Sequence, residues 1–298
     1  MPPMENWNMY KFIARGLVMV LALCASLAAD ASPYSALYVF GDSLSDNGNI
    51  PVTSPLSYRP SSPYADGRFS NGQVAAEYLA SNLGVPLFDF AVGGATTGIS
   101  NPDVPTLPNS GVMSQVNAFT SLHLAGVDSK ALYMIWAGPN DVLNGISPID
   151  AVSNIVAEVT ALHALGAQRF LVPNMVDLSL TPLGALVPGA HDVSVIFDAL
   201  LAAELPSYVT QFDTFSLLSD VVANPGDYGL TNATDPCFDG ASVCANPDSY
   251  LFWDALHPTT AAHRILAAAF TSAVPEPNSI VLLGLALFAL GFNHRKRA

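Results

Sequence analysis

Basic side chains are scarce in this sequence, which has 10 lysines and arginines against 24 aspartates and glutamates and a formal net charge of −14 at pH 7. Between residues 32 and 273 the basic residues are Arg59, Arg68, Lys130, Arg169 and Arg264. A protein that binds nucleic acid needs a patch of basic side chains to contact the phosphates. The composition therefore excludes nucleic acid as a partner, and it disfavours docking on anionic lipid headgroups.

Long apolar runs are also missing. The run near the start spans residues 16–29 and the run near the end spans 280–292, whereas a membrane-spanning helix needs about 20 apolar residues. The first run follows two basic residues and precedes Ala29-Asp30-Ala31. This order of segments is typical of a secretory signal peptide and its cleavage site. The sequence therefore predicts a signal peptide over residues 1–31 and an exported protein.

Cysteine is rare, with three in the whole sequence. Cys24 lies inside the predicted signal peptide, which leaves Cys237 and Cys244 in the exported part. An even pair of cysteines in an exported chain is typical of a disulfide. A zinc site is the alternative, but a lone pair with this spacing and no neighbouring histidine is poor metal-binding spacing. The sequence therefore predicts a Cys237–Cys244 disulfide, no metal and no cofactor.

Five apolar runs, rich in tyrosine, valine, isoleucine and phenylalanine, are typical of buried strands in a parallel sheet. They span residues 36–40, 87–91, 131–137, 169–173 and 209–215. Helical patterns lie between or after them, over residues 73–83, 148–165, 191–205 and 259–273. Because strands and helices alternate, the sequence predicts a single α/β domain over residues 32–273 with a doubly wound parallel sheet.

Two long segments between these elements are rich in turn-forming residues. They span residues 49–71 and 98–111. Long loops at the carboxyl edge of such a sheet usually shape the substrate cleft. We therefore expect both loops to border the cleft, and the second to cover an acyl groove if the substrate is a lipid. Surface decoration is the alternative for each.

Three side chains have the chemistry of a serine nucleophile and its activating pair. Ser43 lies in Gly41-Asp42-Ser43-Leu44, directly after the first predicted strand. A serine hydroxyl is a weak nucleophile until a base removes its proton. His257 is the candidate base, and Asp254, three residues earlier, is the candidate carboxylate that orients it. The alternative for Ser43 is an ordinary turn serine.

Two further turns offer hydrogen-bond donors to an oxyanion, the negative oxygen that forms when an ester carbonyl is attacked. Gly94 lies in the turn after the second predicted strand, and Asn140 follows the third. Because the carboxyl ends of parallel strands share one edge, we expect these donors near Ser43. The alternatives are a plain turn for Gly94 and a helix cap for Asn140. We expect Asp46 to be a turn residue and His263 to be structural.

Four motifs in order resemble the four blocks of the GDSL or SGNH hydrolases. They are Gly41-Asp42-Ser43-Leu44, Gly94, Gly138-Pro139-Asn140-Asp141 and the Asp254 and His257 pair. The resemblance implies a three-layer α/β/α fold with a flavodoxin-like parallel sheet. It also implies Ser43, His257 and Asp254 as nucleophile, base and orienting acid. The oxyanion hole would consist of the Ser43 and Gly94 N–H groups and the Asn140 amide. The residue sequences of these motifs are similar to those of plant-type GDSL lipases and bacterial lecithinase or haemolysin relatives.

The end of the sequence resembles a PEP-CTERM sorting signal. Pro275-Glu276-Pro277 precedes the apolar run 280–292, and a basic tail follows. The resemblance implies that residues 274–298 are a sorting signal of a Gram-negative bacterium. This signal would be held transiently in the membrane and processed by an exosortase-type enzyme. The alternative is a marginal C-terminal anchor. The protein would then lie in the periplasm, on the cell surface or outside the cell.

These observations predict an exported serine esterase or lipase that hydrolyses acyl esters. The substrate is an ester of a lipid or of an acylated glycan. One alternative is an acetylesterase that acts on extracellular polysaccharide. Another is a non-catalytic surface or matrix-binding protein on the same fold. The presence of Ser43, Asn140, Asp254 and His257 together disfavours this last alternative, because a binding protein does not need all four.

Overall fold

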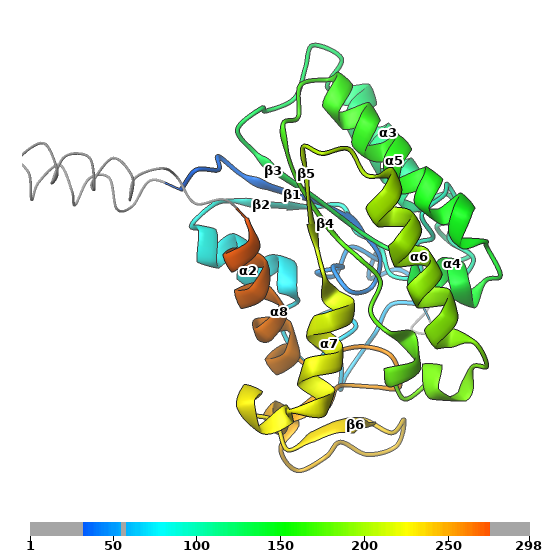
Figure 1. The fold of residues 1–298 in the computed structure, drawn as a ribbon. Helices are drawn as coiled ribbons and strands as arrows, with labels where there is room; N and C mark the ends of the chain where they lie inside the picture. Colours follow the sequence, from blue (N-terminus) through cyan, green and yellow to red (C-terminus); the bar gives the residue numbers. More distant parts are fainter. Residues whose placement is uncertain (1–31, 55–57, 275–298) are drawn as a thin grey trace, which may run out of the picture. The chain divides into compact units, whose positions relative to one another are not determined.

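A five-stranded parallel sheet lies at the centre of the described residues, which are 32–54 and 58–274 of a computed structural model (Figure 1). The strands are β1 (Leu37–Gly41), β2 (Leu87–Asp89), β3 (Leu132–Trp136), β4 (Arg169–Pro173) and β5 (Val209–Phe212). Their order across the sheet is β2-β1-β3-β4-β5. Every residue of β3 is buried, as expected for a central strand that is covered on both faces. The predicted α/β fold with a parallel sheet of about five strands is confirmed.

Helices cover both faces of the sheet and give the three expected layers (Figure 1). One face carries α3 (Val112–Leu122), α5 (Pro148–Ala164) and α6 (Ala190–Glu204), which share one apolar core cluster with the sheet. The other face carries α2 (Ala75–Leu83) and α8 (Thr260–Ala273), which form a second cluster. Two further helices, α4 (Pro139–Leu143) and α7 (Thr214–Ala223), directly follow the carboxyl ends of β3 and β5.

The fifth strand ends earlier than the sequence predicted, because Asp213 starts a helix there. The Asp213 side chain accepts hydrogen bonds from both the N–H and the hydroxyl of Ser216. A carboxylate in this position satisfies a free N–H group of the first helical turn, so α7 begins at Thr214. The second predicted strand is likewise shorter than expected and ends at Asp89, whose carboxylate accepts the N–H of Ala91.

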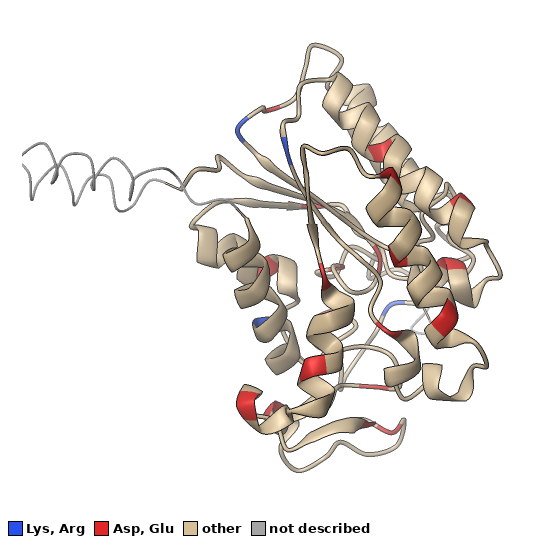
Figure 2. Ribbon diagram, viewed as in Figure 1, with Lys and Arg blue, Asp and Glu red and all other residues tan. Residues whose placement is uncertain are grey.

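The predicted signal peptide lies outside the described residues. So does the predicted sorting signal, apart from Val274. Residues Tyr34–Val274 form one compact unit. Acidic residues are distributed over its helices and loops, and basic ones are few (Figure 2). Within the described ranges no helix is both long and apolar enough to cross a membrane.

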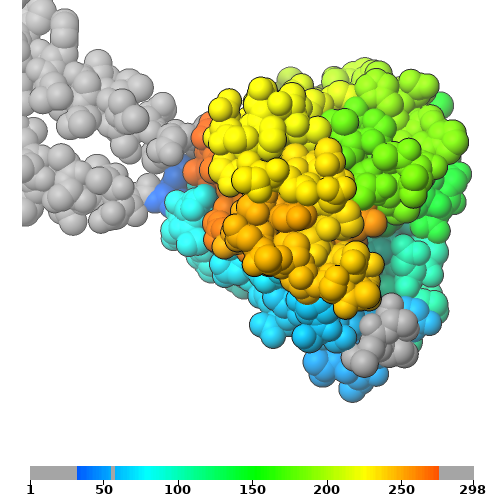
Figure 3. Space-filling view, turned by 90° about the horizontal axis from the view of Figure 1, so that it is seen from below, coloured from blue at the N-terminus to red at the C-terminus, as the bar shows by residue number. Residues whose placement is uncertain are grey.

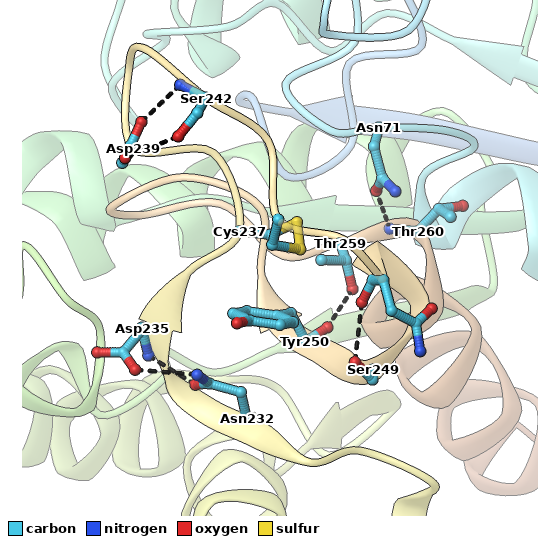
Figure 4. Close-up of a disulfide and its surroundings, with 12 residues drawn as sticks. Asn71, Asn232, Asp235, Cys237, Asp239, Ser242, Ser249, Tyr250, Thr259 and Thr260 are labelled. Carbon is cyan, nitrogen blue, oxygen red and sulfur yellow. Dashed lines mark hydrogen bonds between the residues drawn. A yellow bond between two sulfur atoms is a disulfide. The ribbon is translucent and has the colours of Figure 1, made fainter.

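A small excursion between α7 and α8 carries the predicted disulfide. It contains two parallel strands, β6 (Asn232–Pro236) and β7 (Tyr250–Phe252). Cys237 and Cys244 are joined in the loop between them, and Asp239 accepts hydrogen bonds from Ser242 at the loop tip (Figure 4). The N–H of Cys237 donates to the carbonyl of Phe252. The predicted Cys237–Cys244 disulfide is confirmed. It closes this loop, and the Cys237 hydrogen bond ties the loop to the strand that leads into the segment with Asp254.

Replacing both cysteines with serine is expected to lower the free energy of unfolding by about 2–3 kcal/mol. The bridge spans a sequence separation of 7, and closing a short loop removes conformational entropy from the unfolded chain. Denaturant unfolding of the oxidised wild type and the double variant measures the difference. Wild type treated with a reductant should match the variant, and an unchanged midpoint in both would contradict the prediction.

Glu158 of α5 is a buried carboxyl group in the middle of the core. Neither of its carboxyl oxygens has a hydrogen-bond partner among the described residues. Burial raises the pKa of Glu158 well above its usual 4.5. The folded protein therefore keeps this proton at pH values where the unfolded chain has lost it. Stability should then fall as pH rises above 4.5, by up to about 1.4 kcal/mol per pH unit while the buried group stays protonated.

The variant Glu158→Gln is expected to remove this pH-dependent loss. Its free energy of unfolding should exceed that of wild type by a margin that grows as pH rises from mildly acidic to neutral. Denaturant unfolding at several pH values measures the margin. Glu204→Gln, at the exposed end of α6, is the matched control and should follow wild type. A margin for Glu158→Gln that does not change with pH would be the contrary result.

Candidate active site

Ser43, His257 and Asp254 form a continuous chain of hydrogen bonds at the carboxyl edge of the sheet. The Ser43 Oγ lies 2.8 Å from His257 Nε2. On the other side of the ring, His257 Nδ1 lies 2.8 Å from Asp254 Oδ2 and 3.0 Å from Oδ1. With the Nδ1 proton donated to the carboxylate, neutral His257 presents the lone pair of Nε2 to the serine hydroxyl. The structure thus brings together the three side chains that the sequence singled out.

Ser43 is held in a tight turn at the end of β1. The N–H groups of Ser45 and Asp46 donate to the carbonyl of Asp42, and Asp42 Oδ1 accepts the N–H of Leu44. The turn starts at Gly41, where a Cβ atom would lie only 2.6 Å from the Trp136 carbonyl of the neighbouring strand. The glycine therefore lets β1 approach β3 closely at the point where the chain turns.

Gln115 of α3 fixes the start of this turn, a role that the sequence analysis missed. Its side-chain amide accepts the N–H of Gly41 at 3.0 Å and donates to the Gly41 carbonyl at 2.9 Å. Both backbone groups at the end of the strand are therefore paired by one buried side chain. A polar residue on an otherwise apolar helix face is the signal in the sequence, but α3 itself was not predicted.

Asp254 accepts hydrogen bonds on both carboxylate oxygens. Oδ1 accepts the N–H groups of Leu256 and His257 at 2.8 and 2.7 Å, and Oδ2 accepts the hydroxyl of Tyr64 at 2.8 Å. Burial alone would raise the pKa of Asp254, but His257 and these donors outweigh it and hold the pKa well below its usual range. Asp254 is therefore a carboxylate at neutral pH.

Burial and the contact with Asp254 have opposite effects on the pKa of His257. Burial lowers the pKa of the imidazole, but Asp254 raises it more strongly through its charge and its hydrogen bond. The net result is a pKa above the ordinary value of 6.5. The ring of Phe69 lies 5.1 Å from the imidazole, centroid to centroid. His257 is thus a partly buried imidazole that Asp254 orients and whose protonated form Asp254 stabilises.

Asn140 lies in the first turn of α4 and faces the same recess as Ser43 and His257. One N–H of its side-chain amide donates to the Ala95 carbonyl at 3.0 Å. The amide has a second N–H that can donate elsewhere. The cap of this helix is Gly138, with a φ of 138°. The alternative interpretation of Asn140 as a helix cap is therefore wrong.

The turn that contains Gly94 is held in place from both sides. Asp46 accepts the N–H of Gly93, as well as those of Gly48 and Asn49 in its own turn, and Asn101 donates to the Gly93 carbonyl. Gly94 has a φ of 79°, a conformation that favours glycine. No hydrogen bond within the described residues uses the N–H of Gly94 or of Ser43. Gly94 does not line the recess beside Ser43.

The recess beside Ser43 has a volume of about 310 Å³, and we call it the serine recess. Ser43, Asn140 and His257 line it together with Val176, Leu178, Thr181 and Leu256, among others. No described residue of the loops 49–71 and 98–111 lines it, so the expectation that these loops border the cleft is wrong for this recess. The wall comes instead from the segment after β4, which carries no motif that would have drawn attention to it.

The two loops support the site from outside the recess. Tyr64 binds Asp254, Ser70 donates to the Pro258 carbonyl, and Asn71 accepts the N–H of Thr260. In the second loop, Asn101 binds the turn next to Gly94. The polar side chains of both loops therefore hold the segments that carry Asp254, His257 and Gly94.

His263, the second histidine near the end of the domain, lies on α8 and is fully buried. Its Nδ1 accepts the N–H of Ala75 at the start of α2. Burial lowers the pKa of His263 to about 3, so it stays neutral and joins the two helices. Residues 32–54 and 58–274 contain no group of three or more histidine, cysteine, aspartate or glutamate side chains that could hold a metal ion.

Two family models match the chain. A model described as GDSL-like Lipase/Acylhydrolase matches residues 37–270. A model described as PEP-CTERM protein-sorting motif matches residues 273–296. Both matches agree with the resemblances that the sequence motifs carry.

Curated relatives come from bacteria and plants. The thermolabile hemolysin of Vibrio parahaemolyticus is 29% identical over 76% of this chain and 60% of its own length. Acetylajmalan esterase 2 of Rauvolfia serpentina is 25% identical over 85% of this chain and 91% of its own length. Esterase EstA of Pseudomonas aeruginosa is 29% identical over 89% of this chain and 50% of its own length. The chain therefore spans only part of the hemolysin and about half of EstA.

Among solved structures, Axe2, an acetylxylan esterase from Geobacillus stearothermophilus, has a TM-score of 0.50 and 14% sequence identity. The match covers 82% of this chain and 96% of that one. At this level of identity the likeness concerns the fold, and it agrees with the three layers described above.

Proposed function

Because the chain belongs to the GDSL-like lipase/acylhydrolase family of ester-hydrolysing enzymes, we propose that it is an exported serine esterase with Ser43, His257 and Asp254 as its catalytic triad. The observation that carries the proposal is the unbroken contact from Ser43 Oγ through His257 to Asp254, with 2.8 Å at each step. A nucleophile, a base and an orienting carboxylate in this geometry are what acyl transfer requires.

In the proposed mechanism, Ser43 Oγ attacks the ester carbonyl carbon while its proton passes to His257 Nε2. The tetrahedral intermediate carries its charge on the former carbonyl oxygen, which accepts hydrogen bonds from the N–H groups of Ser43 and Gly94 and from the Asn140 amide. When the intermediate collapses, His257 gives the proton to the departing alcohol. A water molecule then attacks the acyl-enzyme, with His257 again as base, and releases the carboxylic acid and free Ser43.

A fluorophosphonate probe tests this proposal, because it reacts covalently with a serine that a neighbouring base activates. We expect the purified full-length protein to form one adduct, located by mass spectrometry on Ser43. The variant His257→Ala should not react. A protein that neither reacts nor hydrolyses any p-nitrophenyl ester would favour the non-catalytic, matrix-binding alternative.

Two features of the chain support the proposal that the esterase is exported. The PEP-CTERM motif at residues 273–296 indicates export in a Gram-negative bacterium, and the Cys237–Cys244 disulfide suits an oxidising compartment. The further organisation that we propose is a signal peptide over residues 1–31, a hydrolase domain over 32–273 and a sorting signal over 274–298. In this proposal the sorting signal associates transiently with the membrane and is the substrate of an exosortase-type enzyme. The enzyme then works in the periplasm, on the cell surface or outside the cell.

The rate of ester hydrolysis is expected to fall in acid, with a midpoint above pH 6.5. His257 accepts the Ser43 proton only as the neutral imidazole, and Asp254 holds the pKa of His257 above the ordinary 6.5. As pH drops through that raised value, His257 becomes protonated and no longer acts as a base. A plot of log kcat/KM against pH for a short-chain ester measures the midpoint, and a profile that is flat from neutral to mildly acidic pH would contradict the assignment.

Asp42 provides a second test of the same assignment. Burial raises the pKa of Asp42 to about 7, and the ionised form raises the pKa of His257. Asp42→Asn should therefore shift the acid midpoint to lower pH. Asp227→Asn removes an equal charge from an exposed turn, η3 (Pro225–Tyr228), and should leave the midpoint in place.

A further inference from the structure

A second hollow lies next to the serine recess and is larger, with a volume of about 540 Å³. It lies between α7, α8, β7 and the turn that carries His257, and we call it the α7–α8 pocket. Leu218 of α7 and Ala262 and Ile265 of α8 are among its walls. In the space-filling view, α7 in yellow and the orange segment around β7 lie side by side on the face below the sheet (Figure 3).

The α7–α8 pocket adjoins the reacting groups. Four residues line both this pocket and the serine recess, namely Leu44, Val176, Thr181 and Leu256. Leu44 directly follows Ser43, and Leu256 directly precedes His257. An ester whose carbonyl carbon lies at Ser43 therefore has one of its two substituents next to the mouth of this pocket.

The walls of the pocket offer almost no free polar group. None of its lining residues is charged. Thr181 donates its hydroxyl to the Leu178 carbonyl, Thr214 donates to the Asn174 carbonyl, and the Trp136 indole N–H also donates to Asn174. The hydroxyl groups of a sugar would lose their water here without gaining donors or acceptors in return. A hydrocarbon chain loses nothing comparable and gains from burial.

Part of the apolar wall of the pocket is accessible to solvent. Leu217, Leu218 and Ile265 are only partly buried, although they pack against buried neighbours such as Phe252. An apolar hollow that is partly open and that adjoins the serine recess has the properties of a ligand site.

We propose that the α7–α8 pocket binds the acyl chain of the substrate, and that the enzyme acts on esters of medium or long fatty acids. This inference rests on the proposed function of Ser43. It commits the substrate to the lipid class and excludes acetylated polysaccharide, since an acetyl group would leave the pocket empty. A smaller hollow of about 280 Å³ shares Leu178, Thr181 and Leu256 with the serine recess and runs toward Val187.

The test is the dependence of kcat/KM on acyl length for p-nitrophenyl acetate, butyrate, octanoate and palmitate. Wild type is expected to prefer octanoate or palmitate to acetate by at least tenfold, because each buried methylene is worth up to about fourfold in affinity. Ala262→Phe, which fills the pocket, should lower the rate with the long esters by tenfold or more and change the acetate rate less than about twofold. Leu218→Trp blocks the pocket from α7 and should act in the same direction.

Val187→Phe is the matched control, because it narrows the smaller hollow instead. It should leave the ratio of long-chain to acetate rates unchanged. A Ser43-dependent maximum at acetate would overturn the inference, and so would an equal loss at all chain lengths in Ala262→Phe. Both results would leave the proposed function standing.

Binding of a fluorescent fatty acid to Ser43→Ala separates the two proposals, because it needs no turnover. Saturable binding that Ala262→Phe abolishes would support the pocket even if the enzyme hydrolysed none of the esters. Absence of binding, together with Ser43-dependent hydrolysis of short esters, would overturn the pocket and keep the catalytic site.

Tyr64 contacts the carboxylate of Asp254 at the oxygen other than the one that accepts the backbone N–H groups of Leu256 and His257. Its hydroxyl donates to Asp254 Oδ2, the carboxylate oxygen that lies 2.8 Å from His257 Nδ1. The ring is held edge-on against Trp253 and Phe238, with centroids 6.0 and 5.7 Å away. The geometry assigns Tyr64 as a positioning residue that fixes the carboxylate and draws part of its negative charge away from the imidazole.

Tyr64→Phe keeps the ring and removes only this hydrogen bond. We expect kcat to fall about tenfold with KM unchanged, since a hydrogen bond to a charged group is lost. The acid midpoint of the pH profile should move upward, because the carboxylate then stabilises protonated His257 more strongly. Tyr78→Phe is the matched control: its hydroxyl binds Thr260, three residues after His257. A pH profile and a kcat that are both unchanged in Tyr64→Phe would overturn the assignment.

Discussion

Replacing Ser43 with alanine is expected to reduce kcat for any ester by about 10⁶-fold, the size of loss seen when a serine hydrolase loses its nucleophile. No other hydroxyl can take its place, because His257 Nε2 contacts Ser43 Oγ and the next serine, Ser45, has a fully buried hydroxyl without a hydrogen-bond partner among the described residues. The fold should persist, since only one side-chain hydrogen bond is removed from a turn that its backbone holds. Thermal unfolding and steady-state rates measured on the same preparation test both statements.

Ser45→Ala is the matched control for this experiment. It removes an equal hydroxyl two residues away, and we expect it to retain the wild-type rate. If Ser43→Ala hydrolysed esters at the wild-type rate, the catalytic proposal would fall. If both variants lost activity and unfolded at lower temperature, the loss of activity would reflect damage to the turn rather than loss of the nucleophile. The position of the fluorophosphonate adduct would then test whether Ser43 is the nucleophile.

Replacing Asn140 with alanine is expected to lower kcat by about 10²–10³-fold with little change in KM. One N–H of the Asn140 amide is engaged with the Ala95 carbonyl at 3.0 Å, so the side chain is already fixed before substrate arrives. The second N–H then donates to the oxyanion without a cost for reorganisation, which is the usual source of such rate effects. The effect belongs in kcat because the charge appears on the oxygen only in the transition state.

The neighbouring Asn144 provides the control for Asn140. Asn144→Ala removes an amide at the end of the same helix that donates to the backbone carbonyl of Asn140 and not to the serine recess, and it should leave the rate within about twofold of wild type. Asn140→Asp has nearly the same volume but carries a negative charge toward the developing oxyanion, and it should be at least as slow as Asn140→Ala. A KM effect alone in Asn140→Ala would show that the amide binds the substrate equally in the ground state.

The sequence predicted those parts of the candidate site whose side chains lie in short, recognisable motifs. Ser43, Asn140, Asp254 and His257 each follow a strand or form a compact turn, so residue type and position sufficed to place them near one another. The five apolar runs predicted the sheet for a similar reason, since strands buried on both faces leave a continuous apolar signal.

The parts that could not be predicted depend on contacts between distant segments. Tyr64 meets Asp254 across 190 residues, and Gln115 meets Gly41 across 74 residues. Neither pairing has a local pattern. The helix α7 escaped prediction because its apolar residues continue the apolar run of β5, and only the capping by Asp213 separates the two. Because α7 forms one wall of the α7–α8 pocket, that pocket could not be predicted from the sequence either.

The order of these groups along the chain has a consequence for the cell that makes the enzyme. Ser43 lies in the turn after the first strand, whereas the proposed base, His257, follows 214 residues later, just before the last helix of the domain. That helix is joined to α2 through His263 and Ala75, so the end of the domain must fold back onto its beginning before the site exists. A growing or clipped chain that ends before His257 therefore carries Ser43 without the proposed base, and we expect it to hydrolyse no ester.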